Sequence, residues 1–151
     1  MQLSFAQTAI FNSSQIDSIV KIIDSTCVHA GISDGVIKNP ETAEKIGGFS
    51  YWYFTDSTHD HLIKVVHEES LNSYDFTYYY FFEDKLIYLF FKRGEQTGDK
   101  TKTTSKGKYY LQNDKLIYKD DEIDFSFDKP VYLKTAKGFL KDSNIWGKHI
   151  K

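Results

Sequence analysis

The sequence has one cysteine and no long apolar run, and each absence removes a class of protein. Cys27 has no second cysteine to pair with, so a scaffold stapled by internal disulfides is excluded. No apolar run approaches the roughly 18 residues that a membrane-spanning helix needs, so we expect no integral membrane segment. The compartment stays open, because exported proteins without disulfides are common.

Arginine is almost missing as well. Arg93 is the only arginine among 19 basic residues, and the net charge of the chain is −2. Recognition of bases and phosphates relies on the planar, bidentate guanidinium group, and a polyanionic partner favours a basic protein. We therefore expect no nucleic-acid partner.

Aromatic residues are abundant, at 17% of the 151 residues, and proline occurs only twice. Aromatic side chains suit the pleated, half-buried surface of a strand. A chain of this length is typical of one domain with one core. The sequence predicts a single α+β domain, in which an N-terminal helix packs on a curved antiparallel sheet of about six strands and a short C-terminal helix follows.

Two segments have the periodicity of amphipathic helices. Residues 14–29 repeat apolar side chains at helical spacing after a polar Asn-Ser-Ser start that can cap a helix. Residues 130–142 repeat them after Asp128, with Pro130 in the first turn, where proline is tolerated. These segments are the predicted N-terminal and C-terminal helices.

The first 12 residues have two interpretations. Ser4-Phe5-Ala6 has small residues at the two positions that a signal-peptidase site requires, so the segment resembles the stub of a trimmed export signal. It is equally compatible with an N-terminal arm that forms an ordinary strand.

The predicted sheet covers residues 49–127. From Phe49 onwards apolar residues recur with a period of two, and alternation returns over residues 123–127 as a last strand. Residues 31–47 contain three glycines and an Asn-Pro pair and are predicted to be a loop.

A ten-residue pattern occurs twice within the predicted sheet. Residues 79–88 and 109–118 both read Tyr-Tyr-x-x-x-Asp-Lys-Leu-Ile-Tyr, with short polar residues between two apolar runs. This is typical of a β-hairpin, and we expect turns at residues 83–85 and 113–114. The segment between them, residues 92–108, is rich in Lys, Thr and Gly and is predicted to be an exposed, mobile connection.

The paired units and the helix over residues 14–29 resemble small exported bacterial α+β proteins of the β-lactamase-inhibitor-like and PepSY-like kind. The resemblance covers residues 76–118 as well as that helix. It implies a helix packed on a curved antiparallel sheet, and a non-catalytic role in protein binding or in the cell envelope. It assigns no functional residue.

Histidine and carboxylate groups suggest no reaction centre. His59 and His61 lie two residues apart, but His67 follows about 20 Å further along an extended strand, beyond the reach of one ion. The acidic run at residues 120–124 lacks the glycine and final glutamate of a calcium-binding loop. No nucleophile, phosphate-loop or metalloprotease motif is present. The sequence predicts no catalytic residue, no metal site and no cofactor.

Aromatic residues are the stronger functional signal. Two predicted strands place them on both faces, so either the sheet curls and buries both faces or one face is a binding platform. The candidate binding residues are Tyr51, Trp52, Tyr53, Tyr78, Tyr79 and Tyr80.

Two functions follow from this composition. The first is a non-enzymatic protein-binding protein of inhibitor or toxin-neutralising (immunity) type, periplasmic or secreted, with a cytoplasmic location as the alternative. The second is a cystatin-like or nuclear-transport-factor-like cone that encloses a small apolar ligand, with weak chemistry at Tyr or His. A flat exposed aromatic face favours the first, and a closed cavity lined by Tyr and His favours the second. The sequence leaves the oligomeric state open.

Overall fold

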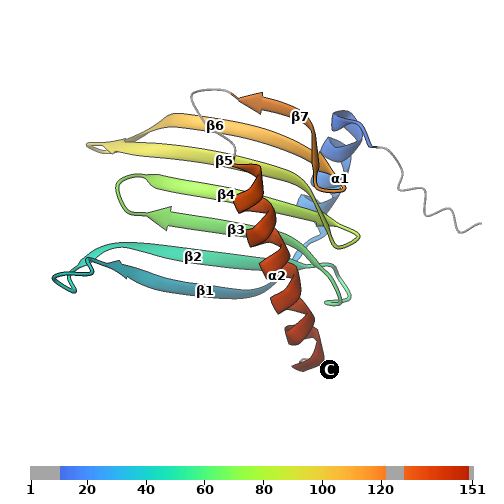
Figure 1. Cartoon of the computed structure of the whole chain (residues 1–151), viewed down its shortest axis with the longest axis horizontal. Coiled ribbons are helices and arrows are strands. Elements are labelled where there is room, and N and C mark those ends of the chain that lie inside the picture. The colour runs from blue at the N-terminus through green and yellow to red at the C-terminus, as the bar shows by residue number, and fades with distance from the viewer. Residues whose placement is uncertain (1–10, 122–127, 150–151) are drawn as a thin grey trace, which may run out of the picture.

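Seven antiparallel strands pair in the order in which they follow one another, so the sheet is a meander with a helix on each face (Figure 1). The computed structural model describes residues 11–121 and 128–149. The α+β class and the two helices are as predicted. The elements are α1 (Ser13–Thr26), β1 (Val28–Lys38), β2 (Lys45–Thr55), β3 (Leu62–Ser70), β4 (Tyr74–Phe82), β5 (Lys85–Thr97), β6 (Lys100–Gln112), β7 (Lys115–Asp121) and α2 (Lys129–His149).

Helix α1 begins at a capping box. The Asn12 side chain accepts a hydrogen bond from the Gln15 backbone N–H, and the Gln15 side chain accepts one from the Asn12 backbone. The helix ends at Thr26, three residues before its predicted end, because Cys27 has an extended backbone and β1 begins directly after it.

Each face of the sheet has its own apolar core, since successive side chains of a strand point to opposite faces. On one face, Tyr79, Leu89 and Tyr109 pack with Ala136 and Phe139 of α2. The second core lies on the other face and joins the isoleucines of α1 to tyrosines of the sheet; its buried members are Ile16, Ile23, Tyr80, Ile87, Tyr88 and Tyr110.

Carboxylates of α1 fix that helix on its face. The Tyr110 hydroxyl donates a hydrogen bond of 2.7 Å to Asp17, and the Tyr80 hydroxyl donates one of 3.0 Å to Asp24. Lys64 forms an ion pair of 2.7 Å with Asp24 and lies over the Tyr80 ring, 5.2 Å from its centroid. Because both ends of the helix are held, α1 lies over one row of residues across the sheet.

The prediction of a loop over residues 31–47 is wrong. Most of this segment belongs to β1 and to the start of β2, and only residues 39–44 connect them. Gly35 fits a strand here because the Phe49 ring lies over it, so an added Cβ would approach Phe49 to 2.6 Å. Gly47 is required for a similar reason, since a Cβ would overlap the Ser70 carbonyl oxygen.

Residues 92–108, predicted to be an exposed, mobile connection, form two paired strands, and residues 95–102 are exposed as predicted. The segment is a hairpin: β5 continues to Thr97, β6 starts at Lys100, and Gly98 turns the chain with φ of 66°. The strands pair without large apolar side chains because backbone hydrogen bonds and β-branched threonines are enough to form a ladder.

Both predicted hairpins of the repeat are confirmed, with turns after Phe82 and Gln112. Helix α2 is longer than the predicted 130–142 and runs from Lys129 to His149. Two further predictions lie outside the described residues: the strand over residues 123–127 and, except for Phe11 and Asn12, the two interpretations of the first 12 residues.

We predict that the turn at Glu83 and Asp84 is strained and that substitution can relieve the strain. Glu83 and Asp84 both have positive φ, 50° and 58°, which costs a residue with a Cβ roughly 1 kcal/mol relative to glycine. The double substitution Glu83→Asn, Asp84→Gly should therefore raise the free energy of unfolding by about that amount, as measured by urea denaturation. The double substitution Glu83→Gln, Asp84→Ala removes the same two charges and keeps side chains that disfavour positive φ at both positions. An equal gain from this variant would show that charge, not conformation, is responsible.

Candidate functional site

The six aromatic residues predicted to bind a partner do not form one surface. Opposite residues of paired strands share a face, and the register places Tyr51, Tyr53 and Tyr79 on the side of α2. Trp52, Tyr78 and Tyr80 lie on the side of α1. The structure therefore separates the six into two groups of three.

Tyr79 and Tyr80 are the most buried of the six, with 3% and 5% of their surface exposed. Burial raises the pKa of both hydroxyls far above its ordinary value, and the negative charge of Asp24 adds to the effect at Tyr80. Both residues therefore remain protonated and act as core residues with a hydroxyl group.

On the α2 side, Tyr51 and Tyr53 are half covered by the helix. The Phe139 ring of α2 contacts both, with centroids 5.6 Å and 6.2 Å away. Tyr51 also stacks on His67 of β3, with parallel rings 4.3 Å apart. These contacts occupy the aromatic rings, so this group is part of the helix packing.

The α1 side is only partly covered. Figure 1 shows α1 behind one end of the strands, and the described part of the chain places no helix behind the other end. Trp52 is half-buried and Ile32, opposite it on β1, is 48% exposed. We call this region the open face; it consists of Ile32, Val36, Trp52, Tyr74, Phe76, Tyr78 and Phe90.

Charge is divided across the open face. Phe76 of β4 has Glu68 opposite it on β3 and Lys92 opposite it on β5. Asp34 extends the acidic side on β1, and Lys106, whose Nζ lies 5.9 Å from the Phe90 ring centroid, extends the basic side on β6. The open face therefore carries acidic residues on its β1–β3 side and basic residues on its β5–β6 side, with aromatic residues of β4 between them.

A polar cluster lies on the α2 side near the same end of the strands. Arg93 donates two hydrogen bonds of 2.8 Å to the two carboxylate oxygens of Asp75. Burial alone would raise the pKa of Asp75, but hydrogen bonds from Arg93 and Ser73 hold it below its usual value. Burial lowers the pKa of His67, while the charges of Glu69 and Asp75 oppose this effect.

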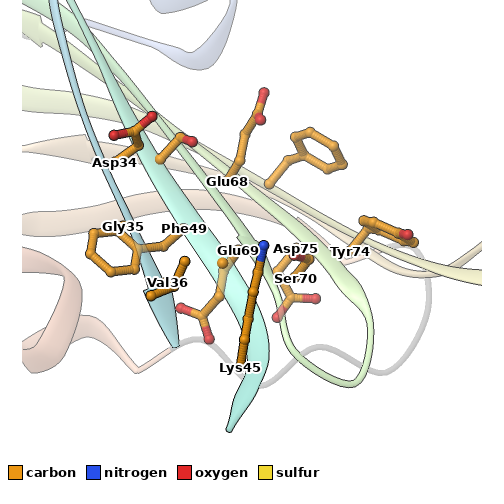
Figure 2. A pocket seen from close by; sticks show the side chains of 13 residues that line it. Asp34, Gly35, Val36, Lys45, Phe49, Glu68, Glu69, Ser70, Tyr74 and Asp75 are labelled. Atoms are coloured by element: carbon orange, nitrogen blue, oxygen red, sulfur yellow. The ribbon is translucent and has the colours of Figure 1, made fainter. Parts of the chain in front are cut away.

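A hollow of about 460 Å³ lies at the ends of β1–β4 that are farthest from α1 (Figure 2). Four carboxylates line it, but Figure 2 shows Glu68 and Glu69 pointing to opposite sides of the sheet. Asp34 lies on the side of Glu68, and Asp75 on the side of Glu69. The carboxylates therefore do not converge on one point.

A cleft of about 510 Å³ lies between the edge strand β1 and α2. Gly31 and Ser33 of β1, Tyr53 of β2 and Ser143 of α2 line it, together with the turn that carries His59 and His61. The Thr55 hydroxyl and His59 Nδ1 share a hydrogen bond of 3.2 Å, which helps to hold His59 at φ of 61°. The cleft is apolar with a few polar groups and is partly open to solvent.

Within residues 11–121 and 128–149, no three His, Cys, Asp or Glu side chains come together in a way that could hold a metal ion. His59 and His61 line the cleft, whereas His67 lies in the polar cluster beyond Tyr51. In the same described residues, neither helix is long and apolar enough to cross a membrane.

No family model, curated protein or solved structure matches the chain.

Two features of the site had little signal in the sequence. The Asp75–Arg93 pair joins residues 18 positions apart, and only the pairing of β4 with β5 brings them together. The cleft depends on the path of α2 over β1, which no local pattern encodes. The solitary Arg93 was the one available sign of a bidentate ion pair.

We predict that His67 makes the fold sensitive to mild acid. Its folded pKa lies below 6.5, so the unfolded chain binds the proton more tightly. Stability is then lost as the pH falls from about 6.5 towards the folded pKa. His67→Phe keeps a ring against Tyr51 and removes this titration, so its urea midpoint should fall less than that of the wild type between about pH 7 and pH 5.

His61→Phe is the matched control, because the His61 side chain is 62% exposed. This variant retains His67, so its urea midpoint should fall more than that of His67→Phe over the same pH range. A His67→Phe protein that loses as much stability as the wild type over the same range would contradict the prediction.

Proposed function

We propose that this protein is a non-enzymatic binding protein that holds a protein partner on its open face. The observation that supports this most directly is the half-uncovered side of the sheet, where Trp52, Tyr78 and Phe90 adjoin the exposed Ile32 and Tyr74. Tyr and Trp contribute most to binding energy at protein interfaces, and large exposed apolar patches mark such interfaces.

The arrangement of charge suits a protein partner better than a flat apolar ligand. An aromatic centre with polar borders is the usual anatomy of a protein–protein interface. Glu68 and Lys92 lie on opposite sides of Phe76, so a bound partner would meet opposite charges at the two borders and could bind in only one orientation. Inhibition of an enzyme or neutralisation of a toxin is the sharpest form of this function.

Photo-crosslinking in the native cell tests the proposal. A benzophenone amino acid replaces Tyr74, which is 41% exposed on the open face, and in a separate protein Tyr118, which is 52% exposed on β7. We expect Tyr74 to give one discrete crosslinked protein, identified by mass spectrometry, and Tyr118 to give none. Equal crosslinking from both positions, or none from Tyr74, would contradict the proposal.

The identified partner then allows a direct measurement of affinity. Trp52→Ala should weaken binding of the purified partner by at least about tenfold in calorimetry, since central aromatic residues carry most of the energy. Ile22→Ala is the control, because Ile22 is an exposed apolar residue of α1 away from the open face. Melting temperatures of both variants separate a loss of binding from a loss of folding.

A small apolar ligand is a second candidate, and the cleft beside β1 supports it. Its volume of about 510 Å³ is in the range of ligand sites, and Tyr53, His59 and His61 line it. Native mass spectrometry of protein from its own host provides the test. A bound molecule that is lost in Ser143→Trp, which fills the cleft, would support this function over the first.

A further inference from the structure

The two edges of the sheet differ in how well they are protected from further pairing. The edge strand β7 has seven residues, of which four are charged. The edge strand β1 has eleven residues without proline, and only Asp34 and Lys38 are charged. Charged and short edge strands resist pairing with another chain, whereas a long, weakly charged edge invites it.

The backbone of β1 is regular over Gly31–Ile37, the stretch with which a further strand could pair. Bulges interrupt its pairing with β2 between His29 and Gly31 and between Ile37 and Lys38, but the register is continuous from Gly31 to Ile37. In an antiparallel edge strand, alternate N–H and C=O groups point away from the neighbouring strand. This stretch of β1 therefore presents a row of outward backbone groups, and within residues 11–121 and 128–149 no strand pairs beyond it.

The two faces of β1 differ sharply in side-chain size. On the α2 side the strand presents the small residues Gly31, Ser33 and Gly35, with no heavy atom within 4 Å of a Cβ added at Gly31. On the other side it presents Ile32 and Val36, 48% and 49% exposed, with Asp34 between them.

Helix α2 extends past this edge. In Figure 1 it crosses β1 and continues beyond it, and Ser143 lines the cleft together with Gly31 and Ser33. A strand added beside β1 would lie about 4.8 Å further out, under the end of the helix. Its side chains on that face would enter the cleft, where the small residues of β1 leave room for large ones.

We propose that β1 accepts an extended segment of a partner protein as an eighth strand of the sheet. The segment alternates, with large apolar side chains entering the cleft below α2. Its other side chains continue the open face: apolar residues meet Ile32 and Val36, and a basic residue meets Asp34. This inference rests on the proposed protein-binding function and names the form of the partner. Backbone hydrogen bonds would supply affinity, and the alternating side chains would supply specificity.

Selection from a phage-displayed library of random linear peptides tests the proposal. We expect enriched sequences in which large apolar residues alternate with polar ones and a basic residue occupies a fixed position. The enriched peptide should slow amide hydrogen exchange within Gly31–Ile37 by at least about tenfold, because those amides become hydrogen-bonded in the complex. Enriched peptides without alternation, no enrichment, or protection only elsewhere in the protein would each overturn the proposal.

Two variants at exposed positions sharpen the test. Ser33→Phe places a ring in the cleft and should weaken peptide binding by at least about tenfold, whereas Tyr118→Ala should leave it unchanged. Selection against Asp34→Lys should replace the basic preference with an acidic one. Melting temperatures confirm that the variants fold.

Other possible occupants of the β1 edge, and failure of either proposal, give results that can be told apart. A concentration-dependent dimer in light scattering that Ser33→Phe abolishes would show that a second copy fills the edge, and would overturn the proposal. If Tyr74 crosslinks a partner whose addition leaves the β1 amides unprotected, the open-face function stands and strand addition fails. If peptides pair with β1 but Tyr74 crosslinks nothing, the edge binds peptides in vitro while the proposed function fails, and with it the biological role of strand addition.

Discussion

Strands β2 to β6 carry large apolar side chains on both faces, so the sheet needs cover on each side. The two helices cover their faces to different extents, because they differ in length and in position along the strands. The 21 residues of α2 span about 31 Å, enough to cross seven strands that are together about 29 Å wide. The 14 residues of α1 span only about 21 Å, and the helix lies over one end of the strands. The open face exists because α1 lies over one end of the strands and leaves the other end uncovered.

Aromatic residues with polar groups make such a half-covered sheet possible. Under α1, Tyr80 and Tyr110 bury their rings and donate their hydroxyls to the helix carboxylates, which a phenylalanine could not do. Lys64 similarly covers the Tyr78 and Phe54 rings with its ammonium group while pairing with Asp24. Away from the helix the same kinds of side chain are half exposed. Aromatic residues therefore form the core under α1 and part of the surface beyond it.

Elements that depend on local sequence signals were predicted correctly. The predictions were wrong where the conformation of a segment depends on residues far away in the chain. Asn113 and Asp114 indicate a turn without further context, and the spacing of the isoleucines in α1 indicates a helix. Gly35 was predicted to lie in a loop because the local sequence does not show why a glycine is needed there. The Phe49 ring, on the neighbouring strand, leaves no room for a Cβ at this position. The six candidate aromatic residues could be divided between two faces by counting along each strand. Which face stays open could not be found that way, because it follows from the paths of the helices.

Chain order and sheet order coincide, and this has a consequence for how the protein folds. Each strand pairs with the strand just before or after it, so every step of sheet formation closes a short loop at small entropic cost. Such local pairing lowers the contact order and speeds folding relative to sheets whose strands cross over. During synthesis, hairpins can form one after another as they leave the ribosome. Helix α2, which follows β7 in the chain, is made after the seven strands and can dock on a sheet that has already formed.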